Sequence, residues 1–134
     1  LGNLNARRDW GHAKDYTEMQ WRIMQQKKPK DYVIATGHAY SVKQFVNIAA
    51  NYLDMKILWK GKGLNEIGYT INKNKKEILV KIDKKYFRPN EVEYLKGDAS
   101  KALKDLKFKP KYSFKALVED MIDGDLLEAK KELE

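Results

Sequence analysis

The chain has 134 residues, with 27 lysines and arginines against 19 acidic residues and no cysteine. A chain of this length can bury a core of its own, so we expect one domain over residues 1–134. The lack of cysteine excludes a disulfide framework and thiolate metal sites, and it agrees with a cytoplasmic location. No apolar run approaches the roughly 20 residues of a membrane-spanning helix, so no membrane partner is expected.

The net charge of +8 raises the question of a nucleic-acid partner. The lysines are, however, spread over almost every segment, and residues 72–76 (NKNKK) have the composition of a solvated loop. Charge spread in this way governs solubility and non-specific binding before it confers specificity. We therefore expect no nucleic-acid partner and a preference for an anionic ligand.

The first half of the chain predicts a helix, a strand and a second helix. Apolar side chains recur at helical spacing over residues 13–26, and Pro29 ends that helix. Residues 31–37 (DYVIATG) form a short apolar run that ends in glycine, which is typical of a buried strand. Ser41 and Gln44 then form a capping box, and an apolar helical face follows them.

The second half continues this alternation of strands and helices. The predicted elements are, in order, a strand at 57–60 (ILWK), a turn-rich connection at 61–69 (GKGLNEIGY), a strand at 77–83 (EILVKID), a turn at 88–93 (RPNEVE), a helix at 100–106 and a last helix at 114–122. Asp98 or Ser100 can cap the first of these helices, and a charged tail follows Gly124. The pattern predicts an α/β fold.

Arginine is rare in this chain and lies at element boundaries. The four arginines are Arg7, Arg8, Arg22 and Arg88, and every other basic residue is a lysine. A planar guanidinium group can bind a phosphate or carboxylate through two hydrogen bonds, whereas lysine is a hydrated point charge. The pair ahead of the first helix, and Arg88 in a turn, therefore indicate anion recognition. Surface arginines without a ligand are the alternative.

Few side chains suit metal binding or catalysis. His12 and His38 are the only histidines, and they lack the further ligands that a metal site needs, so none is expected. His12 is expected to serve in packing or hydrogen bonding. Asp9 and Asp15 are expected to fix nearby arginines or to cap the helix. No nucleophile–base pair or phosphate-cradling loop is present, so no catalytic residue is assigned.

Three segments together resemble one enzyme family. They are LGNLNARRDWGHAKDY at the start of the chain, DYVIATG followed by SVKQFV, and RPNEVEYLKGDASKALKDLKFKPKYSF. In order and spacing they are similar to the C-terminal part of GDP-mannose 4,6-dehydratases, members of the extended short-chain dehydrogenase/reductase superfamily, from Leu1 to about Met121. The resemblance implies the α/β substrate-binding portion of a Rossmann-type enzyme, with YVIA in the main sheet of that enzyme.

The resemblance also implies a binding site for a nucleotide sugar. In this superfamily the arginines of the R-D-aromatic and R-P-x-x-V motifs contact the diphosphate, and here those positions are Arg8 and Arg88. Glu91 matches the carboxylate that accepts hydrogen bonds from the ribose hydroxyls, with a solvated turn residue as the alternative. Two guanidinium groups can hold a diphosphate, and a carboxylate can accept from both hydroxyls of a cis-diol.

The cofactor NADP would be bound outside this chain, according to the resemblance. The family's glycine-rich GxxGxxG turn is absent from the sequence. Two Tyr-x-x-x-Lys matches occur, Tyr52 with Lys56 at a helix end and Tyr69 with Lys73 in a lysine-rich loop, and both are expected by chance. The chain is therefore interpreted as a C-terminal fragment with no cofactor site and no catalytic activity of its own.

The function implied for the complete enzyme is the NADP-dependent dehydration of GDP-mannose to GDP-4-keto-6-deoxymannose. This chain would bind the nucleotide sugar, and the family resemblance implies a homo-oligomer. Two other classes of function remain open. One is a free-standing basic module that binds a nucleotide or a nucleic acid, and the other is a structural or oligomerisation piece.

Overall fold

A computed structural model describes residues 1–133, which fall into two compact units. The first unit consists of Leu1–Arg7 and Ser41–Glu93, and the second of Arg8–Tyr40 and the chain from Tyr94 onward. The chain passes from one unit to the other three times: within β1 (Arg7–Arg8), within β2 (Tyr40–Ser41) and between Glu93 and Tyr94. Strands β1 and β2 form a two-stranded sheet. Each unit is described by itself, and the expectation of a single domain stays a prediction.

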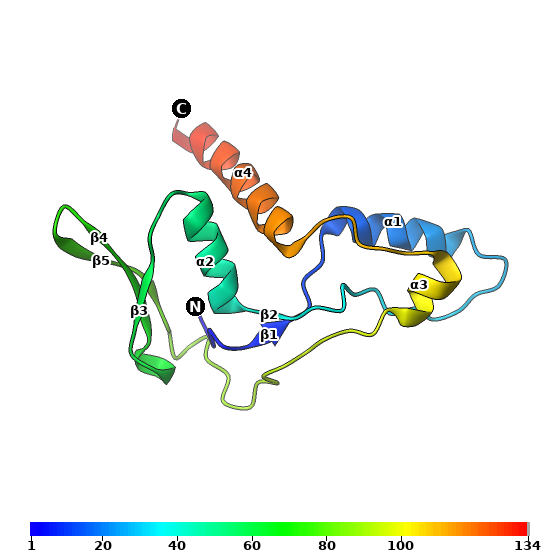
Figure 1. The fold of residues 1–134 in the computed structure, drawn as a ribbon, viewed down its shortest axis with the longest axis horizontal. Helices are drawn as coiled ribbons and strands as arrows, with labels where there is room; N and C mark the ends of the chain where they lie inside the picture. Colours follow the sequence, from blue (N-terminus) through cyan, green and yellow to red (C-terminus); the bar gives the residue numbers. More distant parts are fainter. Residues whose placement is uncertain (134) are drawn as a thin grey trace. The chain divides into compact units, whose positions relative to one another are not determined.

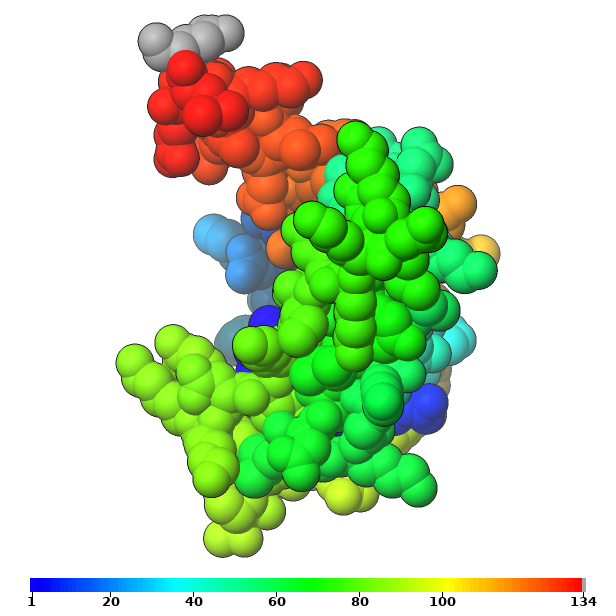
Figure 2. Space-filling model, turned by 90° about the vertical axis from the view of Figure 1, so that its left-hand side faces the viewer, coloured from blue at the N-terminus to red at the C-terminus, as the bar shows by residue number. Residues whose placement is uncertain are grey.

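The first unit contains one α-helix and a three-stranded antiparallel sheet (Figure 1). Its elements are α2 (Val42–Tyr52), β3 (Leu58–Lys60), the short 3₁₀-helix η1 (Gly63–Asn65), β4 (Ile67–Asn72) and β5 (Lys75–Lys81). The sheet order is β3-β4-β5. Figure 2 shows the green side chains of this hairpin at the surface, which agrees with the exposure of almost every residue of β5.

Local sequence signals account for the ends of these elements. The Gln44 backbone N–H donates to Ser41 Oγ at 3.1 Å, and the Ser41 N–H donates to Gln44 Oε1 at 2.8 Å, so the predicted capping box is confirmed. Lys73 and Asn74 connect β4 to β5 with φ angles of 45° and 61°. Positive φ at both central residues is the geometry of a type I′ hairpin turn.

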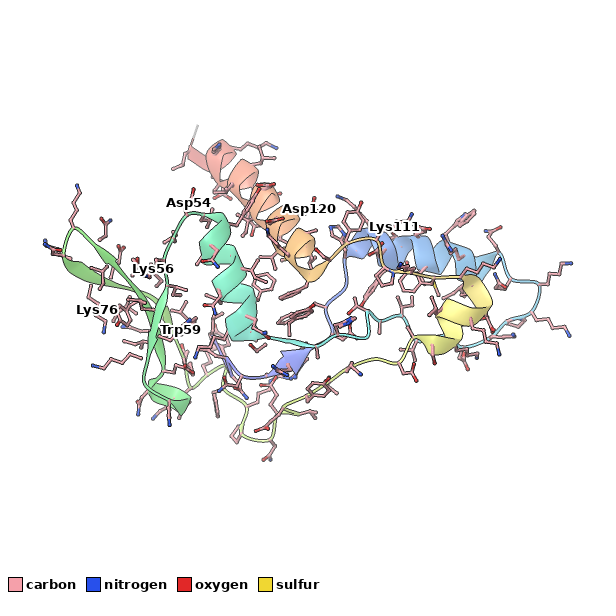
Figure 3. All side chains as sticks on the ribbon, viewed as in Figure 1. Asp54, Lys56, Trp59, Lys76, Lys111 and Asp120 are labelled. Atoms are coloured by element: carbon pink, nitrogen blue, oxygen red, sulfur yellow. The ribbon has the colours of Figure 1, made fainter. Side chains whose placement is uncertain are left out.

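Polar and aromatic contacts hold α2 against the sheet. Trp59 of β3, labelled in Figure 3, donates from its indole Nε1 to Asn47 Oδ1 of α2 at 2.8 Å. Its ring lies over Gly68, where a Cβ would come within 2.9 Å of the indole, so only glycine fits there. Lys43 pairs with the buried Glu66 carboxylate and lies 4.9 Å from the Trp59 ring centroid. The buried charge is therefore paired.

The second unit is helical. Its helices are α1 (Ala13–Met24), α3 (Ser100–Leu106) and α4 (Phe114–Leu133). The core is a cluster of Met19, Ala102, Leu106 and Phe108, against which Ile23, Tyr32, Ile34 and Ala99 pack. No helix in residues 1–133 is both long enough and apolar enough to cross a membrane.

Most of the predicted elements are confirmed, and three predictions are wrong. Residues 31–37 are not a strand among the described residues, because a strand needs a neighbour and no other segment pairs with them. Residues 67–69, predicted as the end of the turn-rich connection, belong to β4 (Ile67–Asn72), so Tyr69 lies on a strand and not in a loop. The charged segment after Gly124 continues α4, because one glycine weakens a helix without ending it.

Candidate functional site

The Arg88 motif forms a tight turn in the first unit. The Glu91 backbone N–H donates to the Arg88 carbonyl at 3.3 Å, and Pro89 occupies the second position of the turn, where its fixed φ is favoured. Arg88 is exposed, and Glu91 is half-buried. The turn therefore brings together two of the three predicted ligand residues.

Arg8, the third predicted ligand residue, belongs to the second unit. It lies in β1, is half-buried, and directly precedes Asp9 and Trp10. The predicted convergence of Arg8 with Arg88 and Glu91 on one diphosphate stays a prediction.

The Asp9 carboxylate joins three segments of the second unit. Its Oδ1 accepts hydrogen bonds from the Thr36 N–H at 2.9 Å and from Thr36 Oγ1 at 2.5 Å. Its Oδ2 accepts from the Gly37 N–H at 2.9 Å and from the Gly97 N–H at 3.2 Å. Asp9 thus has a structural role, but not the predicted one, because these four donors belong to other loops and are neither an arginine nor the start of α1. Burial, followed by the negative charge of Asp9, raises the pKa of Tyr16.

A hollow of about 900 Å³ lies beside these loops in the second unit. Its wall includes Thr36, Gly37 and Gly97, which Asp9 binds. Aromatic rings line it as well: Phe114 stacks on Trp10 at 5.5 Å and on Tyr40 at 4.0 Å between ring centroids. Most of the lining is apolar, and several lysines, including Lys96 and Lys109, contribute to it. Hollows of this kind are common small-molecule sites.

Sequence reasoning missed this wall because its members are far apart in the chain. One signal was available. Gly97 approaches Ala35 so closely that a Cβ on Gly97 would lie 2.3 Å from the Ala35 Cβ. Gly37 has a φ of 77°, which favours glycine. The signal in the sequence is thus the presence of Gly37 and Gly97 beside predicted elements, which is typical of a close approach of two loops. Neither glycine indicates which segment it approaches.

His12 has the packing and hydrogen-bonding role that the sequence predicts. Its Nδ1 accepts from the Lys14 N–H at 3.1 Å and so caps α1, while its Nε2 lies 3.1 Å from Asp120 Oδ2 of α4. The ring is buried and stacks on Tyr112 with 4.2 Å between centroids. A hydrogen bond from Lys14 holds the pKa of Asp120 below its usual value, and a weaker one from His12 acts in the same direction.

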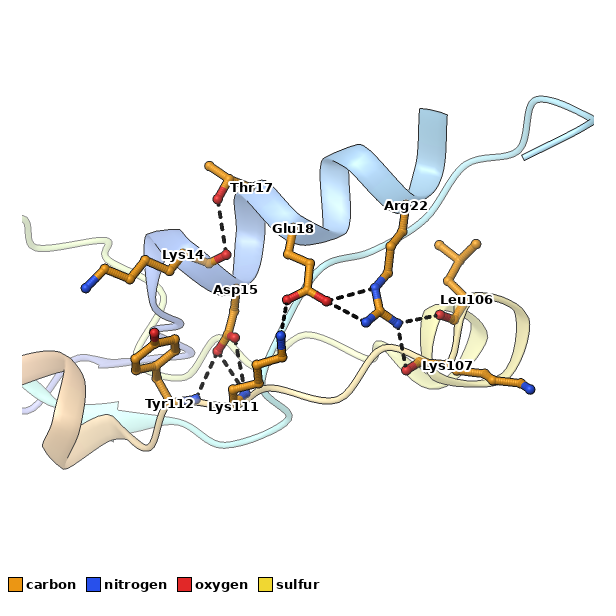
Figure 4. Close-up of polar contacts among 9 residues, drawn as sticks. All are labelled: Lys14, Asp15, Thr17, Glu18, Arg22, Leu106, Lys107, Lys111 and Tyr112. Carbon is orange, nitrogen blue, oxygen red and sulfur yellow. Dashed lines mark hydrogen bonds and ion pairs between the residues drawn. The ribbon is translucent and has the colours of Figure 1, made fainter. Parts of the chain in front are cut away.

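A second polar network fixes α1 to the segments that follow α3 (Figure 4). The buried Asp15 carboxylate accepts from the backbone N–H groups of Lys111 and Tyr112 at 3.1 Å. Glu18 binds the Lys111 ammonium and the Arg22 guanidinium, both at 2.5 Å, and these two bonds lower its pKa. Arg22 therefore has a structural role, as does Asp15.

Neither a cluster of metal ligands nor a glycine-rich turn ahead of an α-helix occurs among the described residues. Within residues 1–133, no three His, Cys, Asp or Glu side chains lie together in a way that could hold a metal ion. The four α-helices of that range begin after His12, Ser41, Ala99 and Ser113, and none of these four follows a glycine-rich turn. Such a turn at a helix N-terminus is what binds a dinucleotide diphosphate.

Comparison with known proteins identifies relatives along almost the whole chain. The family model for GDP-mannose 4,6 dehydratase matches residues 1–121. A Drosophila melanogaster protein named GDP-mannose 4,6 dehydratase is 49% identical over 126 residues, which are 94% of this chain and 31% of that protein. The Homo sapiens protein of the same name is 45% identical over 94% of this chain and 33% of its own length. The chain thus spans about a third of these relatives.

Solved structures of low sequence identity share the fold. The structure of RMD from Pseudomonas aeruginosa complexed with NADPH matches 92% of this chain and 34% of its own, with a TM-score of 0.67 and 12% identity. A putative epimerase from Burkholderia cenocepacia matches the same shares with a TM-score of 0.69 and 20% identity. The expected α/β fold is confirmed.

The family match decides between the classes of function left open above. It covers both arginine motifs, the Asp9 segment and the wall of the hollow, and it does not favour a free-standing nucleotide- or nucleic-acid-binding module or a purely structural piece. The resemblance read from the three sequence segments is confirmed. The chain belongs to the GDP-mannose 4,6 dehydratase family.

Proposed function

We propose that this chain is the nucleotide-sugar-binding portion of a GDP-mannose 4,6-dehydratase. In the complete enzyme it would hold GDP-mannose while water is lost to give GDP-4-keto-6-deoxymannose, which is a hydro-lyase reaction. The observation that carries the proposal is the family match over residues 1–121. A homo-oligomer in the cytoplasm, with no nucleic-acid or membrane partner, belongs to the same proposal.

In this proposal NADP binds to a part of the enzyme outside the described residues, since these lack a glycine-rich turn before a helix. When bound there, NADP supplies a transient acceptor for hydride. The contribution of this chain is to bind and orient the sugar nucleotide. The structure of RMD from Pseudomonas aeruginosa, which shares the fold, was solved in complex with NADPH, and this supports a nicotinamide dinucleotide as the cofactor.

Within the proposed site, Arg8 and Arg88 would bind the diphosphate and Glu91 would accept from the ribose hydroxyls. The tight turn from Arg88 to Glu91 supports this assignment, because it brings the backbone positions of a cation and a carboxylate close together. A cation suits the diphosphate of a nucleotide sugar, and a carboxylate suits the hydroxyl groups of the adjoining ribose. Arg8 ends strand β1 and directly precedes Asp9, whose carboxylate is held by hydrogen bonds, so the backbone of Arg8 is fixed.

The direct test is calorimetric binding of GDP-mannose to the chain and to its Arg8→Ala, Arg88→Ala and Arg22→Ala variants. Arg8→Ala and Arg88→Ala should each weaken the binding of GDP-mannose by about 1.5 to 3 kcal/mol, the range for a hydrogen bond to a charged group. Lysine in place of Arg8 should restore only part of the affinity, because it lacks the planar fork. Arg22→Ala is the matched control, since Arg22 binds Glu18.

Activity provides the second arm of the test. The chain alone, mixed with GDP-mannose and NADP, should form no keto sugar. A chimera of the Drosophila melanogaster relative, in which this chain replaces the segment that it matches, should form it. Turnover by the chain alone would contradict the fragment interpretation. Unchanged GDP-mannose affinity in both arginine variants at low salt would show that the ligand residues are assigned wrongly.

A further inference from the structure

Asp9 follows a proposed diphosphate ligand, yet its carboxylate is fully engaged elsewhere. An ionised carboxylate has about four acceptor positions. Two donors from Thr36 occupy Oδ1, and the N–H groups of Gly37 and Gly97 occupy Oδ2. Three of the four donors are backbone or hydroxyl groups of loops that lie 27 to 28 residues away in sequence, and the fourth lies 88 residues away.

These bonds restrain the backbone on the C-terminal side of Arg8. The peptide between Arg8 and Asp9 is planar, so fixing Asp9 leaves few positions for the Arg8 Cα. On the N-terminal side of Arg8, β1 pairs with β2. Beyond Asp9, Trp10 is held by stacking on Phe114. A long arginine side chain loses less entropy on binding an anion when its backbone is already placed.

We infer that Asp9 is a positioning residue, which acts on the sugar nucleotide through Arg8 and not by contact. The inference rests on the proposed function of Arg8. The Asp9 carboxylate is negative and adjoins a site for an anion, so simple electrostatics opposes its presence there. Its hydrogen bonds to the two loops account for a carboxylate beside the proposed anion site.

Asp9→Asn is an informative variant, because it has two effects of opposite sign on anion binding: it removes a negative charge, and it loses hydrogen bonds to the two loops. Removing the negative charge should strengthen anion binding if Asp9 acts only through its charge. Losing the hydrogen bonds that fix Asp9 should weaken anion binding, because an amide nitrogen cannot accept from the two glycine N–H groups. We expect the second effect to dominate and the affinity for GDP-mannose to fall about tenfold.

Asp15→Asn is the matched control. Asp15 is also buried in the second unit and also accepts backbone N–H bonds from a distant loop, those of Lys111 and Tyr112. Its substitution should lower the urea midpoint of unfolding to a similar extent as Asp9→Asn and leave the GDP-mannose affinity unchanged. Thr36→Val removes one donor to Asp9 without a change of charge, and it should weaken binding in the same direction by less.

The experiment is calorimetric titration of GDP-mannose into the full 134-residue chain and these variants, with circular dichroism to establish folding and with an Arg8→Ala/Asp9→Asn double variant. A double variant that binds no more weakly than Arg8→Ala alone supports action through Arg8. Equal losses in Asp9→Asn and Asp15→Asn, or tighter binding by Asp9→Asn, would overturn the inference while leaving the proposed function intact. No effect of Arg8→Ala would overturn the inference and the assignment of Arg8 as a diphosphate ligand.

Discussion

Asp120 shows how a single exposed carboxylate can join two helices of one unit. It accepts from the Lys14 ammonium at 3.1 Å and lies 3.1 Å from His12 Nε2. Because His12 Nδ1 accepts from a backbone N–H, the ring proton resides on Nε2 and donates to the carboxylate. The start of α1 is thereby bonded to α4.

The lowered pKa of Asp120 gives a stability prediction with a defined sign. A carboxyl group with a lower pKa in the folded state stabilises the fold above its unfolded pKa, near 4, and that contribution is lost as the pH falls through the folded value. Asp120→Asn should therefore lower the urea midpoint at pH 7, and the difference from wild type should shrink on acidification. Urea unfolding at several pH values measures both effects.

Asp125→Asn is the control, because Asp125 lies on the same helix and its substitution changes the charge equally. It should leave the midpoint nearly unchanged at every pH. If the Asp120 and Asp125 variants lost the same stability with the same pH dependence, net charge and not the bonds to Lys14 and His12 would be responsible.

Some residue roles can be predicted from neighbouring residues in the sequence, and others cannot. Ser41 caps α2 through Gln44, three residues away, and the sequence predicts it. The role of Asp9 depends on Gly97, which lies 88 residues away, so no local pattern can indicate that contact. Side-chain chemistry predicts that a carboxylate is satisfied, but only the fold decides by which donors.

At the scale of elements, helices were easier to predict than strands. The repeated apolar face of residues 13–26 predicts α1 because helical contacts are local. Strand β4 was missed because Gly68 and the polar residues at its end resemble a loop, and its pairing with β3 and β5 is what makes it a strand. Residues 31–37 show the converse, since they have strand composition without a strand neighbour.

The β4–β5 turn provides a prediction for one element. Lys73 and Asn74 both have positive φ, which a lysine adopts with strain and which Asn-Gly adopts readily. The double substitution Lys73→Asn with Asn74→Gly should raise the unfolding free energy by about 0.5 to 1 kcal/mol. Thermal or urea unfolding measures the change.

Lys62→Asn is a suitable comparison for this turn, because Lys62 has an extended φ of −146°. It removes the same charge as Lys73→Asn without relieving any backbone strain, so no gain in stability is expected. A gain of equal size in both variants would attribute the effect to charge and not to the turn.

At the scale of the whole molecule, the described surface carries many large apolar side chains. Exposed fractions reach 62% for Trp21, 81% for Met24, 53% for Val33 and 55% for Leu103, all within the second unit. Exposed apolar groups of this size usually mark a surface that another chain or segment covers.

The last prediction is that the isolated chain self-associates. Residues 31–35 expose Val33 and pair with no strand among the described residues, and unpaired extended backbone tends to pair between molecules. Sedimentation velocity should show species larger than a monomer whose share grows with concentration. Val33→Lys places a charge on this segment and should reduce association, whereas Leu133→Lys, at a more exposed position at the end of α4, should change it less. A single monomeric species over a hundredfold range of concentration would contradict the prediction.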